Sequence, residues 1–462
     1  MLNAQNLAIL PCETKSREFD SKILLACILA EKGWHAIVGS RNHIHLALGR
    51  LPPAVYLGKD VRHSSRQIVR ILKRLGHRFV AHDEEALCYY SRERYREARV
   101  DLEVFQSAEC LLAWGPDNVT AWQESPAYKN TPIQITGNGR IDIMRPELRV
   151  LHEKKVAELR AEYGRFILIN TNFGSLNHFF ANLTPIQSPE LLGSNVKIWD
   201  VGLSHHRYKI YRAFLALLPR LGARFPKMTF ILRPHPSENH QAWLEAARGA
   251  KNIHVTNAGS AIPWILASEA IIHNGCTTGL EAHILNGKPI AYQPAVSEIY
   301  DLHLPNDLSS IAYDEASLFT LLDTIINKKN DPRNLHSPER EALLARHISA
   351  THGQLASERI ADALVEVAAS NADAKRVSWD RWLAGLLHAE IRAAIKRINM
   401  HRRGHKGNIA YTKHRFPDTP LAEVELRIAD FRRALQRFQT VGVEQFAANV
   451  FLIRPVVFEG VA

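Results

Sequence analysis

The sequence lacks several patterns that would assign the protein to a class at once. Its five cysteines are scattered and show no Cys-x-x-Cys spacing, which argues against both a disulfide framework and a zinc knuckle. Uncharged apolar runs such as residues 23–30 are far shorter than the roughly 18 residues that a membrane span needs. The N-terminus also lacks the basic and then apolar segments of a signal peptide. These absences predict a cytoplasmic protein with free, buried thiols.

Motifs for metals and common cofactors are missing as well. There is no Asp-x-Asp motif, no Gly-x-x-x-x-Gly-Lys loop and no complete Gly-x-Gly-x-x-Gly fingerprint, of which residues 137–140 are only a fragment. The histidine pairs at 205 and 206 and at 401 and 405 have no third ligand at metal spacing. We therefore expect no metal site and no cofactor. Any phosphate of a substrate must then be neutralised by protein groups.

Composition indicates a globular protein with anionic partners. Hydrophobic residues make up 46% and charged residues 23% of the 462 positions, which suits two domains and an appendage. The formal net charge of +11 favours a sugar nucleotide, an anionic membrane surface or nucleic acid as partner. Nucleic acid is disfavoured because no helix-turn-helix, zinc-finger or RNP-like motif accompanies the charge.

Short strand-like runs alternate with helical patterns, which predicts parallel sheets. Strands are expected at residues 7–11, 35–39, 54–58, 78–81, 109–114 and 132–136, and again at 166–170, 228–232, 252–256, 270–273 and 289–292. Two such Rossmann-like halves predict a GT-B-like α/β fold, in which two domains face a central cleft. Later helices are expected at residues 340–368, 379–398 and 420–439. The expected parts are an acceptor domain (1–145), a nucleotide-sugar domain (146–336) and a basic, helical C-terminal extension (337–462).

The most informative segment is residues 270–292, taken together with residues 228–236. Each begins as an apolar strand-like run and ends in turn residues, and in the downstream segment a helical pattern then opens at Thr277 and Thr278. Exposed backbone N–H groups and the positive end of the dipole make such a helix start a phosphate site, to which two hydroxyls add donors. The competing interpretation is a plain helix cap.

Five further residues lie close to this turn in the expected sheet. Arg233 and His235 end the upstream strand and should reach the same edge as Asn274 and Gly275 of the turn. Glu281 lies one turn into the helix, where it can hydrogen-bond a ribose diol. The alternatives are a surface cation for Arg233, a structural turn residue for His235 and a dipole-stabilised carboxylate for Glu281.

Two more loops follow expected strands and suit polar ligands. Residues 170–178 are rich in small and amide side chains, so Asn170 and Asn172 are expected to approach a sugar. The loop after the first strand carries charged residues that could bind an acceptor or a substrate carboxylate: Glu13, Lys15, Arg17 and Glu18.

A basic patch lies in the C-terminal part of the chain. Residues 396–406 contain lysine, arginine and histidine in close succession. One interpretation is a solvated surface, and the other is peripheral contact with an anionic inner membrane, to which each basic residue would add about 1 kcal/mol.

Several of these segments together resemble one protein family. They are residues 10–20, 170–174, 233–236, 277–278 and 413–417. They are similar to bacterial surface carbohydrate biosynthesis proteins, which are GT-B-like and related to the retaining β-Kdo glycosyltransferases of lipopolysaccharide and capsule assembly. The resemblance spans nearly the whole chain.

This resemblance implies a CMP-activated donor, with His235, Thr277 and Thr278 on the CMP, and a surface polysaccharide or glycolipid acceptor. It also implies double displacement with a carboxylate nucleophile. The chain departs from the capsule enzymes because asparagines stand in the loop where those enzymes carry an aspartate. Asp200 is the remaining candidate for the nucleophile and Glu124 for the acid/base group, although the first could cap a turn and the second could be an exposed helical charge.

Two other classes of function stay open at this point. One is another nucleotide-dependent enzyme, either a polyol-phosphate transferase or a UDP-sugar 2-epimerase-like protein, since such proteins share the His-Pro and small-residue turns. The other is a non-catalytic GT-B module that binds glycans, which the missing aspartate keeps possible.

Overall fold

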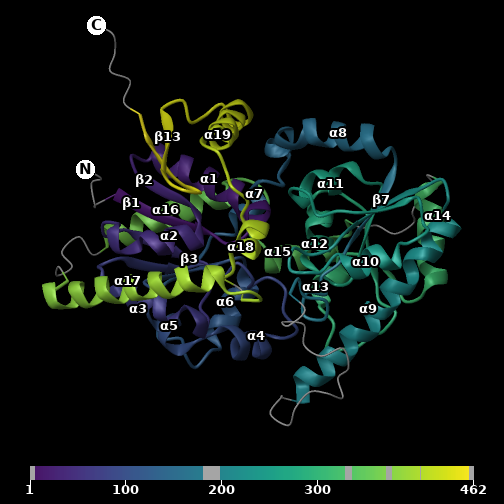
Figure 1. Cartoon of the computed structure of the whole chain (residues 1–462), viewed down its shortest axis with the longest axis horizontal. Helices are drawn as coiled ribbons and strands as arrows, with labels where there is room; N and C mark the ends of the chain where they lie inside the picture. The colour runs from purple at the N-terminus through teal and green to yellow at the C-terminus, as the bar shows by residue number, and fades with distance from the viewer. Residues whose placement is uncertain (1–5, 181–197, 328–335, 371–376, 406, 457–462) are drawn as a thin grey trace, which may run out of the picture. The chain divides into compact units, whose positions relative to one another are not determined.

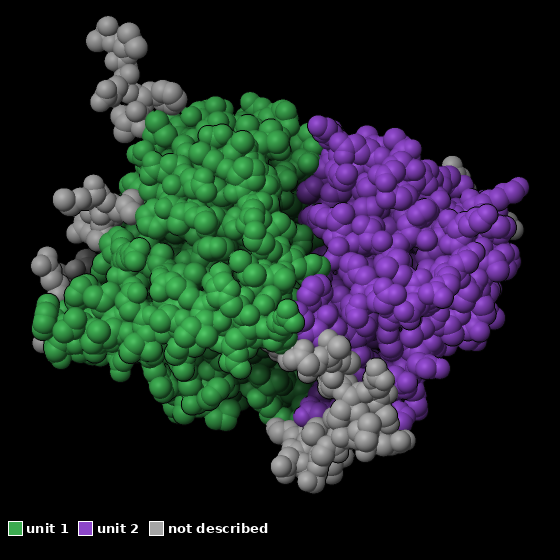
Figure 2. All heavy atoms as spheres, in the orientation of Figure 1, with its two compact units in different colours: residues 1–151, 345–462 green, residues 152–344 purple. Residues whose placement is uncertain are grey.

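The chain folds into two compact units. The computed structural model describes residues 6–180, 198–327, 336–370, 377–405 and 407–456. The first unit comprises Met1–Leu151 with Ala345–Ala462, and the second comprises His152–Leu344 (Figure 2). The expected boundaries at residues 145 and 336 lie near these limits, while the segment after Leu344, expected as a separate extension, groups with the first unit.

An eight-stranded sheet forms the centre of the first unit (Figure 1). Its strands are β1 (Leu7–Cys12), β2 (His35–Ser40), β3 (Val55–Gly58), β4 (Arg78–Ala81), β5 (Cys110–Ala113), β6 (Ile133–Ile135), β13 (Val441–Ala447) and β14 (Val450–Pro455). The order is β13-β14-β2-β1-β3-β4-β5-β6. The first six strands pair in parallel, so their carboxyl ends share one edge. The six strands predicted for this part of the sequence are therefore confirmed.

Helices connect and cover these strands. They are α1 (Lys15–Glu31), α2 (Arg41–Ala47), η2 (Leu48–Arg50), η3 (His63–Ser65), α3 (Arg66–Arg74), α4 (Arg92–Arg99), α5 (Leu102–Gln106), α6 (Pro116–Gln123), α7 (Gly139–Asp142) and η4 (Pro146–His152), then α16 (Ala356–Ala369), α17 (Trp379–His401), α18 (Ile409–Arg415) and α19 (Leu421–Leu435). Helix α15 (Pro338–His347) belongs mostly to the second unit, which ends at Leu344. Helix α1 contacts β2, β14 and α16 and is buried along residues 21–30, which explains its continuous apolar run.

The C-terminal segment completes the first sheet. Sequence analysis expected only helices after residue 337, but β13 and β14 form a hairpin that pairs antiparallel with β2. A close approach makes this pairing possible, because a Cβ atom on Gly39 would lie 2.2 Å from the carbonyl oxygen of Asn449. The Asn449 side chain accepts a hydrogen bond from Thr419 N at 2.8 Å, which joins the hairpin to the segment before α19.

A six-stranded parallel sheet forms the second unit. Its strands are β7 (Phe166–Asn170), β8 (Thr229–Arg233), β9 (Ile253–Val255), β10 (Ala270–His273), β11 (Pro289–Tyr292) and β12 (Ser310–Ala312), in the order β12-β11-β10-β7-β8-β9. Its helices are α8 (Glu153–Tyr163), α9 (Ile198–Arg224), α10 (Gln241–Ala246), α11 (Ala261–Ala267), α12 (Thr277–Ile284), α13 (His303–Asp307) and α14 (Glu315–Ile326). Five of the strands were predicted, and the short β12 was missed.

The core of the second unit explains its topology. Phe214, Leu217 and Leu221 on one face of α9 pack with the apolar strand residues Phe230 and Ile272, all fully buried. Strands that are apolar on both faces are typical of parallel sheets covered by helices. None of the described helices combines the length and the apolar character that a membrane crossing requires.

Candidate functional site at the carboxyl edges of the two sheets

The second sheet brings the ends of three strands together. Asn170 at the end of β7 is in register with Arg233 of β8 on one side and with His273 of β10 on the other. Loops leave the sheet at this edge, which is where ligands bind in open α/β sheets. The strand ends at Arg233 and at the 274–278 turn, which the sequence predicted at one sheet edge, both lie there, with Asn170 between them.

The start of α12 carries two hydroxyl side chains. Its N-cap residue is Cys276, which forms no side-chain cap hydrogen bond, and Thr277 and Thr278 are half-buried. Gly275 has φ of 73°, a left-handed conformation that glycine adopts without strain. The competing interpretation, in which a threonine caps the helix, does not describe this geometry because both threonines lie inside the first turn. An uncapped first turn offers backbone N–H donors and the positive end of the dipole.

A buried histidine that sequence analysis did not single out holds this turn. His273 is fully buried, and its Nδ1 accepts a hydrogen bond from Gly275 N at 3.1 Å. Ser309 Oγ donates its proton to Pro305 O, so His273 Nε2, 2.8 Å from that oxygen, must be the donor. Burial lowers the pKa of His273 to about 3, which keeps the ring neutral. His273 is therefore a positioning residue for the helix start.

Two asparagines connect the neighbouring loops. Asn172 N donates to Asn274 Oδ1 at 3.1 Å, and Arg207 of α9 donates to the carbonyl of Asn172. Asn170 is only 6% exposed, and its Oδ1 has no hydrogen-bond partner among the described residues. A buried acceptor without a donor is costly. The Asn170 amide oxygen is therefore available to a hydroxyl or amine of a ligand.

Arg233 is used within the protein. Its guanidinium donates to the carbonyls of Ala258 at 2.8 Å and Gly259 at 3.0 Å and lies 4.9 Å from the ring centre of Trp264. Burial lowers its pKa to about 9. The guanidinium thus fixes the loop before α11, and the alternative of a surface cation does not describe it.

His235 and a buried carboxylate organise the His-Pro turn. Ser237 N donates to His235 Nδ1 at 3.1 Å, which places the proton of the neutral ring on Nε2. Glu238 is fully buried and accepts hydrogen bonds from His235 N, Thr171 Oγ1, Phe173 N and Trp243 Nε1 at 2.9–3.0 Å. Burial raises the pKa of Glu238. One carboxyl group thereby joins the loops that follow β7 and β8.

Replacing Glu238 with glutamine is expected to destabilise the protein by about 1–3 kcal/mol, because the new amide group cannot accept a hydrogen bond from Trp243. Urea unfolding followed by circular dichroism measures this effect. Glu245→Gln, an exposed change on α10, is the control and should shift stability by less than about 0.5 kcal/mol. Adding Trp243→Phe removes the donor that faces the new amide group. The double variant should therefore lose less stability than the sum of the losses in the two single variants. A fully additive pair would contradict this account.

The remaining predicted residues of this unit lie apart from the edge itself. Glu281 is half-buried on α12, one turn after Thr277. Asp200 is exposed in the first turn of α9, seven positions before Arg207. At 1.5 Å per residue, Asp200 lies about 10 Å from Arg207 along the helix axis, toward the N-terminus of α9.

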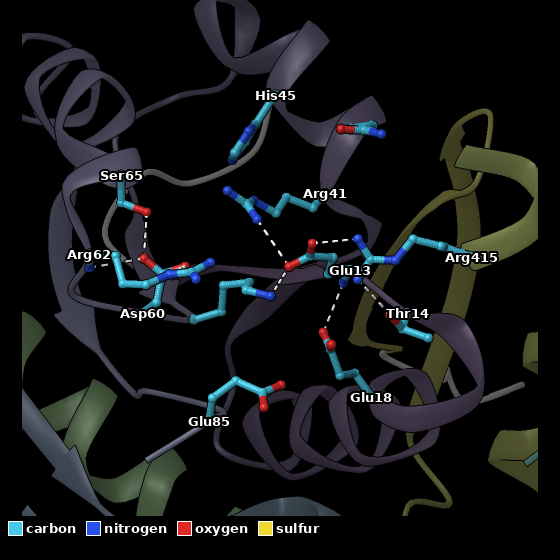
Figure 3. Close-up of polar contacts among 12 residues, drawn as sticks. Glu13, Thr14, Glu18, Arg41, His45, Asp60, Arg62, Ser65, Glu85 and Arg415 are labelled. Atoms are coloured by element: carbon cyan, nitrogen blue, oxygen red, sulfur yellow. Dashed lines mark hydrogen bonds and ion pairs between the residues drawn. The ribbon is translucent and has the colours of Figure 1, made fainter. Parts of the chain in front are cut away.

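The first sheet gathers opposite charges at its own carboxyl edge (Figure 3). Glu13 follows β1, Arg41 follows β2 and Lys59 follows β3. The Glu13 carboxylate pairs with Arg41 at 3.1 Å, with Lys59, and with Arg415 of α18 at 2.6 Å. Three cations thus surround one carboxylate. Burial lowers the pKa of Lys59 and of Arg415, as is usual for cations with incomplete charge compensation.

Arg415 joins two segments that are distant in sequence. It also donates to Thr14 Oγ1 at 2.9 Å, and the next residue, Phe416, packs edge-on against Phe19 with ring centres 5.3 Å apart. Residues 10–20 and 413–417 were both among the segments that carry the family resemblance. Their contact explains why both segments occur together.

The other charged residues predicted in this loop have separate roles. Lys15 pairs with Glu423 at 2.8 Å, and Arg17 lies 3.4 Å from Glu85. Glu18 is 5% exposed and accepts a hydrogen bond from Glu13 N at 2.8 Å. Burial and the neighbouring carboxylate of Glu84 raise the pKa of Glu18 to about 7. Glu18 can therefore exchange a proton near neutral pH.

Glu124 lies away from the edge of the first sheet. It is exposed at the end of α6 and pairs with Arg92 at 3.3 Å and Arg96 at 2.5 Å on α4. The surroundings of Glu124 therefore differ from those of Glu13 and Glu18, which lie where β1 ends.

One group in the second unit has metal-ligand chemistry. His283 at the last turn of α12, His336 and Glu341 of α15 place one ligand atom each within 4.8 Å of one another. His283 is 1% exposed and neither ring nitrogen has a hydrogen-bond partner among the described residues. This group lies at the opposite end of α12 from Thr277. It is separate from the carboxyl edge.

Comparison with known proteins identifies the architecture. No protein-family model and no curated protein sequence matches the chain. A variant of the wall teichoic acid polymerase TagF aligns with 80% of this chain and 91% of that chain, with 10% identity and a TM-score of 0.51. The UDP-GlcNAc 2-epimerases of Methanocaldococcus jannaschii (14% identity, 78% and 99% covered, TM-score 0.45) and Neisseria meningitidis (12% identity, 78% and 99% covered, TM-score 0.46) also align. The fold is GT-B-like, as the sequence predicted.

Proposed function

We propose that the protein is a glycosyltransferase that moves an ulosonic acid, Kdo or a similar sugar, from a CMP-activated donor to a surface polysaccharide or glycolipid, with retention of configuration. The observation that carries this proposal is the start of α12, which follows β10 at the edge of the second sheet where the neighbouring β7 ends at Asn170 and β8 at Arg233. This is the anion-binding geometry expected for the phosphate of a sugar nucleotide.

The donor would bind through neutral groups of this edge. The first-turn amides and hydroxyls of Thr277 and Thr278 face the phosphate, and the protonated Nε2 of His235 adds a donor. Asn170 Oδ1 accepts from a hydroxyl, and Glu281 accepts from the ribose diol. Arg233 would act indirectly, by holding the loop at residues 258–259.

The edge of the first sheet would bind the acidic part of a substrate. An ulosonic acid carries a carboxylate, and charged glycan acceptors carry further anionic groups. Arg41, Lys59 and Arg415 contact the carboxylate of Glu13. Three further carboxylates lie close enough to act on the same cations: Glu18, Asp60 and Glu85. Guanidinium groups bind carboxylates in bidentate geometry, which suits an incoming anion at this cluster.

The chemical step would proceed by double displacement. The Asp200 carboxylate attacks the anomeric carbon, an ester bond to the sugar forms, and the bond to the CMP oxygen breaks so that CMP leaves. An acceptor hydroxyl then loses its proton to an acid/base group and displaces the Asp200 carboxylate. Two inversions give net retention. Glu124 is the sequence-based candidate for the acid/base group, and it pairs with Arg92 and Arg96 at the end of α6. Glu18 is a second candidate for the proton transfer, because its pKa lies near neutral.

Transfer is expected to persist in excess EDTA. Protein amides and hydroxyls neutralise the phosphate in this proposal, and within the described residues the group of His283, His336 and Glu341 lies at the far end of α12. The measurement is the initial rate with and without EDTA. Complete loss that magnesium or manganese restores would contradict the prediction.

A nucleotide panel tests the function itself. Thermal shift and calorimetric titration with CMP, CDP, UDP and GDP compare affinities, because a ligand that binds only the native state raises the melting temperature. Strongest binding of CMP, followed by transfer from CMP-Kdo, supports the proposal. Strongest binding of CDP would instead favour polyol-phosphate transfer, and strongest binding of UDP an epimerase-like reaction. Absence of any binding would favour a non-catalytic glycan-binding module.

A further inference from the structure

Helix α17 is attached to the first unit through small residues. Gly385, Ala389 and Ala393 form its buried face. The helix contacts α3, α2 and η2 (Figure 1), and a Cβ atom on Gly385 would lie 2.7 Å from Arg74 Cβ. Small residues at every fourth position bring the helix close to its neighbours. Leu386 adds a contact with Gly49, and other large apolar side chains of α17 lie outside this contact face.

The large apolar side chains of α17 point to solvent. Their exposed fractions are 57% for Leu387, 60% for Ile391, 53% for Ile395 and 65% for Ile398. These positions lie at helical spacing and form one stripe, which we call the α17 stripe. At the start of the same helix Trp379 and Trp382 are exposed by 72% and 38%. Four exposed large apolar side chains on one side of a helix are typical of an interaction site.

Positive charge accompanies the stripe. Residues 379–405 contain six basic residues (Arg381, Arg392, Lys396, Arg397, Arg402 and Arg403) and two acidic ones (Asp380 and Glu390). A helix with an apolar stripe, interfacial tryptophans and surrounding lysine or arginine is typical of a peptide that lies in the surface of an anionic membrane.

A cavity beside the stripe contains two of these cations. It has a volume of about 490 Å³ and lies where α17 meets α2, lined by apolar Leu46 and Ile395 and by Arg392 and Lys396. Lys396 Nζ reaches only Asn42 Oδ1 at 3.2 Å and His45 Nδ1 at 3.5 Å. Within the described ranges no carboxylate pairs with either cation. Burial lowers the pKa of both groups, as expected without a counter-anion.

We propose that α17 is a membrane-docking helix, which lays the α17 stripe into the surface of an anionic phospholipid bilayer and takes one lipid headgroup phosphate into the cavity with Arg392 and Lys396. The stripe supplies apolar contact, and the two cations supply the recognition of negative charge. Charge complementarity distinguishes this occupant from a second copy of the chain, since two copies would bring the same basic residues together. The inference is independent of the sugar donor.

Vesicle co-sedimentation of the full chain tests the proposal. We expect binding to phosphatidylcholine vesicles that contain phosphatidylglycerol, little binding to phosphatidylcholine alone, and weaker binding at high salt. Changing Ile391 and Ile395 together to glutamine should reduce partitioning at least about tenfold. Arg397→Gln, an exposed change, should reduce it about fivefold. Leu426→Gln is the matched control, because Leu426 is an isolated side chain on α19 with 64% exposure.

A separate pair of variants tests the binding of a lipid headgroup in the cavity. Arg392→Gln with Lys396→Gln should abolish the preference for anionic vesicles more strongly than Arg397→Gln with Arg402→Gln, and circular dichroism confirms that each variant is folded. Equal binding of parent and stripe variant, or equal binding to neutral and anionic vesicles, would overturn the proposal. So would a parent that is dimeric by light scattering, does not bind vesicles, and becomes monomeric in the stripe variant. A pocket variant that behaves like the surface pair would overturn the headgroup assignment.

Discussion

Replacement of Asp200 with asparagine is expected to reduce transfer by about three orders of magnitude or more while CMP affinity stays unchanged. Asparagine has nearly the same shape but cannot form the glycosyl ester on which double displacement depends. Because the lost interaction belongs to the chemical step alone, the turnover rate should fall while the affinity for CMP stays the same. Initial rates and calorimetric titration with CMP measure the two quantities.

The position of Asp200 gives this expectation a physical basis. Arg207 of the same helix donates to the carbonyl of Asn172 at the sheet edge, and Asp200 lies two turns from it toward the N-terminus of α9. Its side chain is exposed, so a substrate can reach it. His205→Gln, an exposed change on the same helix, is the control and should retain normal turnover. A Glu124→Gln variant incubated with donor should accumulate a sugar adduct on Asp200. An adduct elsewhere, or near-normal turnover without Asp200, would disprove the assignment.

Much of the fold could be predicted because its strands are short apolar runs bounded by turn residues. This pattern identifies β1 to β6 and most of the second sheet. It fails for β12, whose sequence Ser-Ile-Ala contains a single large apolar residue, and for the hairpin of β13 and β14, whose exposed half carries Glu444 and Gln445. Pairing of β14 with β2 depends on the close approach at Gly39, a tertiary contact that local pattern does not encode.

Some residues of the candidate site could be predicted from local sequence patterns, whereas others are brought there only by tertiary contacts. The rule that loops after parallel strands meet at one edge correctly predicted that the strand ending at Arg233 and the strand before the 274–278 turn share that edge. Applied to β2 and β3, the same rule would also have selected Arg41 and Lys59, which directly follow those strands. Arg415 comes from a helix far along the chain, and only the family resemblance hinted at its segment.

Roles that depend on burial were the hardest to predict. Arg233 was expected at a phosphate, yet its guanidinium binds two backbone carbonyls. Glu238 and His273 attracted no attention in sequence, although each fixes a loop at the edge of the second sheet. Whether a charged side chain faces a ligand or its own backbone is decided by packing, which a single sequence does not reveal.

Changing Thr277 and Thr278 together to alanine is expected to weaken CMP binding about 100-fold. Each hydroxyl that hydrogen-bonds a charged phosphate contributes about 1.5 kcal/mol or more, and the backbone amides of the first turn remain, so binding should weaken without vanishing. Both side chains are half-buried inside the helix rather than at its cap, so the loss of the hydroxyls should leave the fold intact. Calorimetric titration with CMP measures the affinity, and thermal unfolding verifies stability.

The matched control for this pair is Thr324→Ala on α14, whose hydroxyl hydrogen-bonds its own helix at Thr320 O. That change should leave CMP affinity unaltered. If the double variant binds CMP as the parent does, the phosphate does not lie at the start of α12. If UDP binds the parent far better than CMP, the helix start can still hold a phosphate, but the proposed donor class is wrong. The first result tests where the phosphate binds, because phosphate binding depends on the backbone at the helix start. The second result tests which nucleotide is the donor, because the choice of base depends on other groups of the edge.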